Sequence, residues 1–189
     1  MQYAEKRCEL KTGDILLFEG KGFGSWVIKR ATFSKWSHVG MVYKAADDVF
    51  CYEALKLKKG KDGVQTSLLR ARIKDYDGKI WVRQLRTRRT QSFVERFDTY
   101  RERMKCREYE NNIWELMGAA MPWKNKEDFT SLFCSELIAG AYQALHLIGK
   151  TIIANEFTPG DFSYDGVVEY CLKLCDFQAR LAPEVLLET

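Results

Sequence analysis

The chain has 189 residues, of which 46% are hydrophobic and 30% charged, and it includes only 3 prolines. This length and composition suit one domain over residues 1–189 whose core is large enough to need neither disulfides nor a structural metal. Thirty Lys and Arg against 26 Asp and Glu give a net charge of +4, a basic bias too weak to predict a nucleic-acid partner.

The first half of the chain is expected to form an antiparallel sheet. An apolar run over residues 15–18, bounded by turn-forming residues, predicts a buried strand. Residues 39–44 and 49–55 flank the turn sequence AADD and predict a hairpin. A further strand is expected over residues 79–85.

The second half is predicted to be mainly helical. Apolar residues recur every three or four positions over residues 91–109, the period of an amphipathic helix. A shorter helix is expected over 113–120 and a last one over 167–177. Between them, a helix is predicted from about residue 132 to 147, with Asp128, Thr130 and Ser131 as possible caps. Strands that come first and helices that come later favour an α+β fold.

The cysteines and the chain start favour a cytoplasmic protein. The first residues, MQYAEKRCELKTGD, lack the apolar run of a signal peptide. No stretch approaches the roughly 18 apolar residues of a membrane span, so no stable membrane insertion is expected. The cysteines have no CxxC pair and no regular spacing, as expected of free thiols in a reducing compartment; they are Cys8, Cys51, Cys106, Cys134, Cys171 and Cys175. No feature indicates an oligomeric state.

The chain has only two histidines that could activate a thiol. His146 follows Cys134 on the same predicted helix at a distance of about 18 Å, because a helix rises about 1.5 Å per residue. His38 begins the first strand of the predicted hairpin. A loop of two or four residues pairs Gly40 with Glu53, which makes Glu53 a diagonal neighbour of His38 within reach of its ring.

Cys134 is the favoured nucleophile. It lies in FCSEL, at or next to the first turn of its predicted helix. There the positive end of the helix dipole favours a thiolate, and free N–H groups could form part of an oxyanion hole. Cys51 shares the predicted face of His38 and is the rival nucleophile, but a strand centre lacks the helix dipole. These residues alone do not establish that Cys134 and His38 meet in space.

Two other groups of residues have competing interpretations. Cys171 and Cys175 lie four apart on the last predicted helix, but only His146 remains as a third metal ligand, so core thiols are the simpler interpretation. We predict no metal and no cofactor. The basic residues between 83 and 89 suit either a solvated turn or a weak patch for acidic lipid headgroups.

A series of motifs over about residues 12–163 carries a family resemblance. In chain order they are GDILLF, SHVGMVY, YEA, FCSELIA and TPGDF. Their combination resembles the permuted papain-like cysteine hydrolases of the NlpC superfamily, and among these the YiiX-like branch, which includes poxvirus relatives. The resemblance implies a permuted papain-like fold, with a small antiparallel sheet or partial barrel against helices and the cysteine at a helix N-terminus. It implies Cys134 as nucleophile, His38 as general base and Glu53 as the residue that orients His38.

The implied function is that of a cysteine peptidase or amidase, which cleaves a peptide or isopeptide bond through an acyl-enzyme. The same triad would serve a lipid esterase or acyltransferase. A non-catalytic binding module for an amino acid or lipid headgroup is the alternative from another class. Trp36 and Ser37, just before His38, suit either pocket walls or packing. The resemblance is weakest over residues 56–78 and in the helix from Gln91, so the choice among peptide, amide and lipid substrates stays open.

Overall fold

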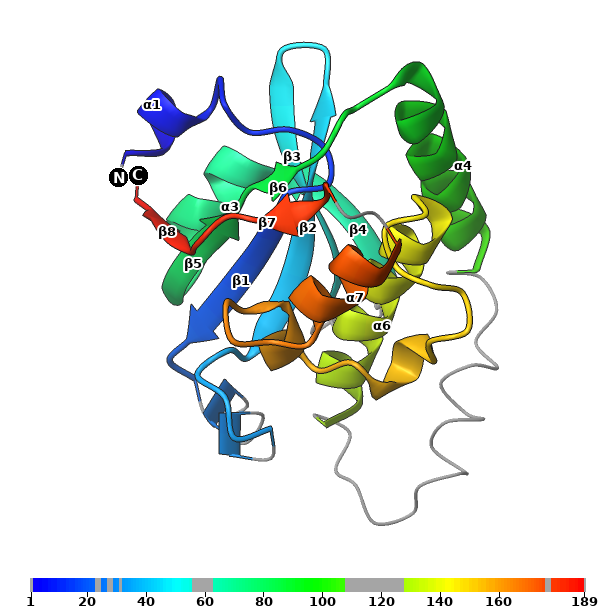
Figure 1. Ribbon diagram of the computed structural model, residues 1–189. Helices are drawn as coiled ribbons and strands as arrows, with labels where there is room; N and C mark the ends of the chain where they lie inside the picture. Colours follow the sequence, from blue (N-terminus) through cyan, green and yellow to red (C-terminus); the bar gives the residue numbers. More distant parts are fainter. Residues whose placement is uncertain are drawn as a thin grey trace.

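The fold is built on a six-stranded antiparallel sheet with the strand order β4-β3-β2-β1-β5-β8 (Figure 1). The computed structural model describes residues 2–22, 25–26, 29–30, 32–55, 63–107, 128–175 and 178–188. The six strands are β1 (Ile15–Gly20), β2 (His38–Ala45), β3 (Asp48–Leu55), β4 (Gly63–Leu68), β5 (Gly78–Arg83) and β8 (Val185–Leu187). A separate two-stranded sheet pairs β6 (Leu85–Arg86) with β7 (Arg180–Leu181).

Helices pack on this sheet, as the predicted α+β class requires. They are α1 (Tyr3–Lys6), α3 (Leu69–Asp75), α4 (Gln91–Arg107), α6 (Asp128–Ala144) and α7 (Val168–Cys175), with 3₁₀ turns η1 (Ala154–Glu156) and η2 (Pro159–Phe162). Helix α6 lies against β2 and β3, and α4 packs on α6 (Figure 1). Helix α3 contacts β3 and β4. In the described part of the chain, no helix is long and apolar enough to cross a membrane.

Both faces of the sheet are buried, which explains the unbroken apolar run of β1. Ile15 and Leu17 belong to the larger core, which includes the inward side of α6. Leu16 and Phe18 belong to a second core with Leu69 of α3. Because successive strand residues point to opposite faces, α6 and α3 cover opposite sides of the sheet.

The hairpin has the predicted register. Met41 pairs with Tyr52 and Ala45 with Asp48, which leaves Ala46 and Asp47 as a two-residue turn. At the open end of the hairpin, a Cβ atom on Gly40 would lie only 3.3 Å from the Cβ of Glu53. Because Gly40 has no side chain, the space beside Glu53 stays free. This agrees with the prediction from the pairing of Gly40 with Glu53.

The helix that carries Cys134 corrects one prediction. It begins at Asp128 rather than near residue 132, so Cys134 lies in its second turn and not at its N-terminus. Asp128 is of a residue type favoured at helix starts, and it is the first residue of this helix. Thr130 and Ser131, the other two predicted caps, lie inside the helix. The sequence did not predict β4, α3, or the short elements α1, β7 and β8. The helix predicted over 113–120 lies outside the described residues.

Candidate active site

His38 occupies the first position of β2, where several contacts fix it. It pairs with Phe18 of β1, whose ring meets the imidazole edge-on with the ring centroids 4.9 Å apart. The preceding residue, Ser37, is buried; its hydroxyl donates to the carbonyl of Phe18 and accepts from the N–H of Gly20. Ser37 thus joins β1 to the start of β2.

Glu53 lies on β3 with its carboxylate inaccessible to solvent. Its Oε2 atom is 2.8 Å from Nε2 of His38. Arg72, on α3, donates its Nε to Oε1 at 2.7 Å and its Nη2 to Oε2 at 3.1 Å. Burial alone would raise the pKa of Glu53, but His38 and Arg72 outweigh it and lower that pKa to about 2. Glu53 is therefore a buried carboxylate with two cationic partners.

Arg72 is the residue of this cluster that the sequence interpretation missed. Besides its two bonds to Glu53, its guanidinium lies 5.0 Å from the ring of Phe18 and 4.8 Å from that of Tyr76. A buried carboxylate needs full compensation of its charge, so an acidic residue within the largely apolar segment 49–55 was a signal for a nearby cation. Arg72 falls in the segment 56–78, where the family motifs give no alignment.

Cys134 is the second side chain that contacts the imidazole. It lies on α6, fully buried, and interacts with His38 both electrostatically and through a side-chain hydrogen bond. Burial lowers the pKa of His38, but Cys134 and Glu53 together outweigh it and raise this pKa to about 9. Because Nε2 faces Glu53, Nδ1 is the ring nitrogen left for the sulfur. The structure thus brings together Cys134, His38 and Glu53.

Hydrogen bonds from two tyrosines fix the position of α6. Tyr142 of α6 donates its hydroxyl to the carbonyl of Gly13, just before β1, at 2.8 Å. Tyr100 of α4 donates to the carbonyl of Leu137 at 2.8 Å. Both hydroxyls reach across elements, so α6 is held from the sheet side and from the α4 side. The helix position in turn sets where the Cys134 sulfur lies.

Cys51, the rival nucleophile, lies in a different environment. It is fully buried at the centre of β3. Burial raises the pKa of its thiol well above the usual value, and the negative charge of Glu53 raises it further. A buried thiol beside a carboxylate stays protonated, so this position disfavours nucleophilic chemistry.

Trp36 is buried and lies beside a hollow. Its side chain is 2% exposed and packs edge-on against Trp81, with ring centroids 6.0 Å apart. It also lines a hollow of about 600 Å³ between the segments 32–36 and 158–167. The hollow therefore reaches Trp36, which precedes His38 by two residues.

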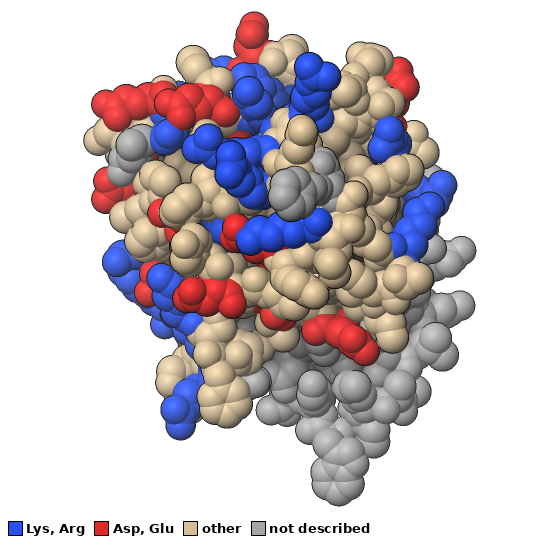
Figure 2. All heavy atoms as spheres, in the orientation of Figure 1, with Lys and Arg blue, Asp and Glu red and all other residues tan. Residues whose placement is uncertain are grey.

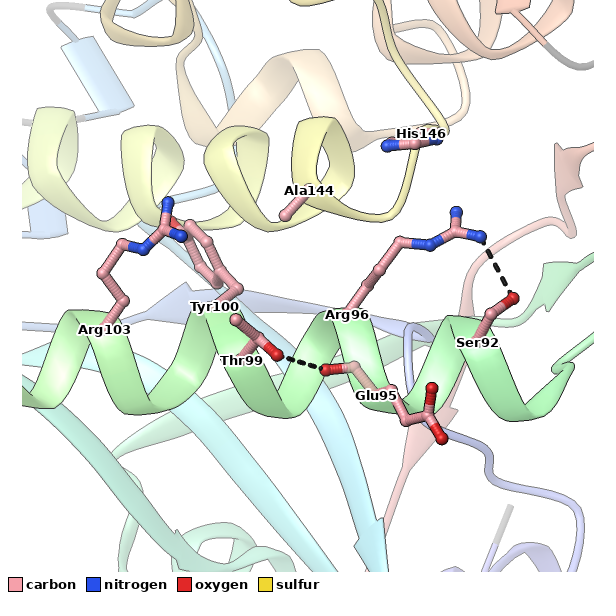
Figure 3. Close-up of a pocket in the computed structure, with 8 residues that line it drawn as sticks. All are labelled: Ser92, Glu95, Arg96, Thr99, Tyr100, Arg103, Ala144 and His146. Carbon is pink, nitrogen blue, oxygen red and sulfur yellow. Dashed lines mark hydrogen bonds between the residues drawn. The ribbon is translucent and has the colours of Figure 1, made fainter.

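His146 ends α6 instead of joining the cluster. It has a left-handed φ of 60°. Its N–H donates to the carbonyl of Gln143, and the N–H of Leu147 donates to that of Tyr142 at 2.8 Å, the hydrogen-bond pattern of a Schellman C-cap. Figure 3 shows His146 beside a separate hollow of about 390 Å³, which Arg96 of α4 also lines.

Cys171 and Cys175 lie on α7, with Cys171 buried and Cys175 exposed. Among the residues that the structure describes, no three His, Cys, Asp or Glu side chains form a group that could hold a metal ion.

No family model and no curated protein matches the chain. Its fold is similar to the solved structure of YiiX from Escherichia coli O157:H7, a DUF1105 protein described as a metalloprotein, with a TM-score of 0.50 and 23% sequence identity. The match covers 71% of this chain and 65% of that one, so the chain spans slightly less than two thirds of the length of YiiX. At this identity the similarity concerns the fold. It is consistent with the YiiX-like branch that the sequence motifs resemble.

Proposed function

We propose that the chain is a cysteine hydrolase of the permuted papain-like type, with Cys134 as nucleophile, His38 as general base and Glu53 as the residue that orients His38. The observation that carries the proposal is the line of contacts from Cys134 through His38 to Glu53, in which the pKa of His38 is raised to about 9. A histidine that stays protonated at neutral pH beside a cysteine suits a thiolate–imidazolium pair. The proposed substrate is a peptide or isopeptide bond.

The reaction would proceed in two steps. The thiolate of Cys134 attacks the carbonyl carbon and forms an S–C bond, His38 gives its proton to the leaving amine, and the C–N bond breaks to leave a thioester. Water then attacks the thioester, with His38 accepting a proton, and the acid and the free thiolate are released. Glu53, which accepts from Nε2, would keep the imidazole in one orientation and stabilise its charged form throughout. The same steps would cleave an ester.

The position of Cys134 within α6 changes the source of thiolate stabilisation. In the second turn, its own N–H belongs to the helical hydrogen-bond pattern, and the helix dipole acts mainly within the first turn. The N–H of Cys134 is therefore not proposed as an oxyanion donor. Stabilisation of the thiolate is assigned to His38 instead.

The burial of Cys134 favours a second candidate, a non-catalytic binding module. With the sulfur inaccessible to solvent, a substrate carbonyl reaches it only if covering side chains move. A binding module would retain the buried cluster for stability and would have no need of a reactive thiol. For either candidate we propose a cytoplasmic location, supported by the free thiols at Cys8, Cys51, Cys134, Cys171 and Cys175.

Alkylation by iodoacetamide between pH 4 and 9, with the labelled peptides identified by mass, tests the proposal. Cys8 and Cys175 are exposed and serve as controls within the same molecule, because ordinary thiols react mainly near and above a pKa of about 8.5. We expect Cys134 to retain most of its maximal alkylation rate at pH 6, and to lose this in His38→Ala. The pH profile, rather than the absolute rate, separates activation of the thiol from access to it.

Two results would contradict the hydrolase. One is a Cys134 profile that follows that of Cys8, which would leave the binding module as the better candidate. The other is selective labelling of Cys51 at low pH, which would overturn the choice of nucleophile.

A further inference from the structure

The arginines between residues 83 and 89 divide into two that point into the molecule and two that point out. Arg83 is fully buried and donates to the carbonyls of Leu181 and Ala182, among others. Arg89 donates to the carbonyl of Thr12 and to the carboxylate of Asp14. By contrast, Arg86 and Arg88 are exposed. Two of these four arginines therefore bond within the fold, and the other two are exposed to solvent.

A third arginine joins the two exposed ones. Strands β6 and β7 pair Arg86 directly with Arg180, which is also exposed. Like charges that face each other across a strand pair repel and destabilise it. Within the described part of the chain, none of these three guanidinium groups has an ion-pair partner. A bound anion would relieve their repulsion.

The three arginines surround a hollow. It has a volume of about 350 Å³ and is lined by Arg86, Thr87, Arg88, Gln178 and Arg180. Among the described residues that line it, there is no carboxylate. Figure 2 shows Lys and Arg side chains gathered over the part of the molecular face where β6 and β7 lie in Figure 1. We call this hollow, defined by the five residues above, the arginine hollow.

We propose that the arginine hollow binds a phosphate monoester group. Guanidinium groups match phosphate oxygens with paired hydrogen bonds, and three of them suit a doubly charged anion better than a single carboxylate. The hollow is large enough for the phosphate and a small group attached to it. A soluble phosphate ester and a lipid headgroup share this chemistry.

The backbone that carries these arginines is held in place before a ligand arrives. Arg83 fixes β7 through the carbonyls of Leu181 and Ala182, which flank Arg180 on its C-terminal side. Arg89 donates to the carbonyl of Thr87 at 2.9 Å and so fixes the segment between Arg86 and Arg88. A site whose backbone is already ordered loses less entropy when it binds.

The arginine hollow is separate from Cys134 and His38. Its first lining residues come just after β5 in the chain. The last residue of β5, Arg83, pairs with Ile15 at the start of β1. His38 pairs with Phe18, towards the other end of that strand. The inference therefore does not depend on the proposed hydrolase activity.

Titration of the full chain with glycerol 3-phosphate by isothermal calorimetry at low salt tests the site. We expect binding that Arg86→Gln/Arg180→Gln weakens at least about tenfold, because a hydrogen bond to a charged group contributes about 1.5 to 3 kcal/mol. The matched control, Arg96→Gln/Arg103→Gln, removes the same charge from the hollow of Figure 3 and should keep wild-type affinity within about twofold. Arg88→Gln, outside both strands, provides a second variant in case the double variant fails to fold.

Sedimentation with phosphatidylcholine vesicles that contain 10% phosphatidic acid distinguishes the two sources of the phosphate. Vesicle binding that glycerol 3-phosphate displaces would identify a lipid headgroup, and binding of the soluble ester alone would identify a soluble ligand. The proposal is overturned if neither probe binds the wild type. It is equally overturned if both double variants, or neither of them, lose affinity, since the hollow would then have no specific part in binding.

Discussion

At the scale of single residues, the unusual feature is a carboxylate without solvent contact that holds two cations. Glu53 bonds to His38 with one oxygen and to Arg72 with both. A single histidine would leave the carboxylate charge unneutralised whenever the imidazole lost its proton during a reaction. Arg72 keeps its charge at every physiological pH, so it holds Glu53 ionised and in place while His38 exchanges protons.

Replacement of Arg72 should therefore cost more than the loss of an ordinary surface arginine. We expect Arg72→Ala to lower the free energy of unfolding by about 3 kcal/mol, because it removes one of the two cationic partners of the buried Glu53 carboxylate. Arg72→Lys should lower it by about 1 kcal/mol, since a lysine keeps the charge but loses the paired geometry. Urea unfolding at pH 7 measures both. The control is Arg70→Ala, an exposed position on the same helix, which should change stability by less than about 0.5 kcal/mol; equal effects at positions 70 and 72 would contradict this role.

At the scale of elements, the hairpin places Glu53 beside His38. Its two-residue turn fixes the register, and the register puts a glycine opposite Glu53. A Cβ atom on Gly40 would lie 3.2 Å from the carbonyl oxygen of Tyr52 and 3.3 Å from the sulfur of Cys51. The absence of a side chain at position 40 thus keeps the path between Glu53 and His38 open.

Gly40→Ala should disturb this path. We expect it to lower the free energy of unfolding by about 1 to 3 kcal/mol, the usual effect of overpacking a filled core. It should also reduce alkylation of Cys134 at low pH, because a displaced Glu53 orients His38 less well. The matched control is Gly22→Ala, where an added Cβ would meet nothing within 4 Å. Unchanged stability and alkylation in Gly40→Ala would show that position 40 does not set the geometry of the cluster.

A contact could be predicted from the sequence when the contacting residues lie close together in the chain or on adjacent strands. The His38–Glu53 contact was predictable because a short turn fixes the register of two adjacent strands. The Arg72–Glu53 contact was not, since it requires β4 and α3 to carry the chain back over β3. The start of α6 was placed four residues too late because several good cap residues follow one another there. The meeting of Cys134 with His38 depends on packing between distant segments, which no local pattern specifies.

At the scale of the whole molecule, the cluster joins the two layers that cover the sheet. Helix α6 packs on one face and carries Cys134, while α3 contacts the strands from the other and carries Arg72. His38, at the first position of β2, lies where the two layers meet and contacts Cys134 and Glu53. Electrostatics at this point therefore bear on the stability of the entire domain.

The dependence of the free energy of unfolding on pH in the acid range should reveal this coupling between the layers. The pKa of Glu53 is lowered from its usual 4.5 to about 2 by His38 and Arg72, so the folded state binds its proton more weakly than the unfolded state does. The resulting stability is fully present above pH 4.5 and is lost as the pH falls through about 2. Each pKa unit corresponds to about 1.4 kcal/mol, so the loss should be on the order of 3 kcal/mol.

Glu53→Gln isolates this contribution, because glutamine has nearly the same shape and does not titrate. We expect the difference in free energy of unfolding between wild type and Glu53→Gln to be largest above pH 5 and to shrink steadily towards pH 2. Urea unfolding at half-unit steps of pH would follow it. A difference that stayed constant over this range would mean that Glu53 does not change its charge there, and that its bonds to His38 and Arg72 do not hold an ionised carboxylate. A shrinking difference would instead show that one buried charge, bonded to residues of both layers, contributes to how the domain responds to acid.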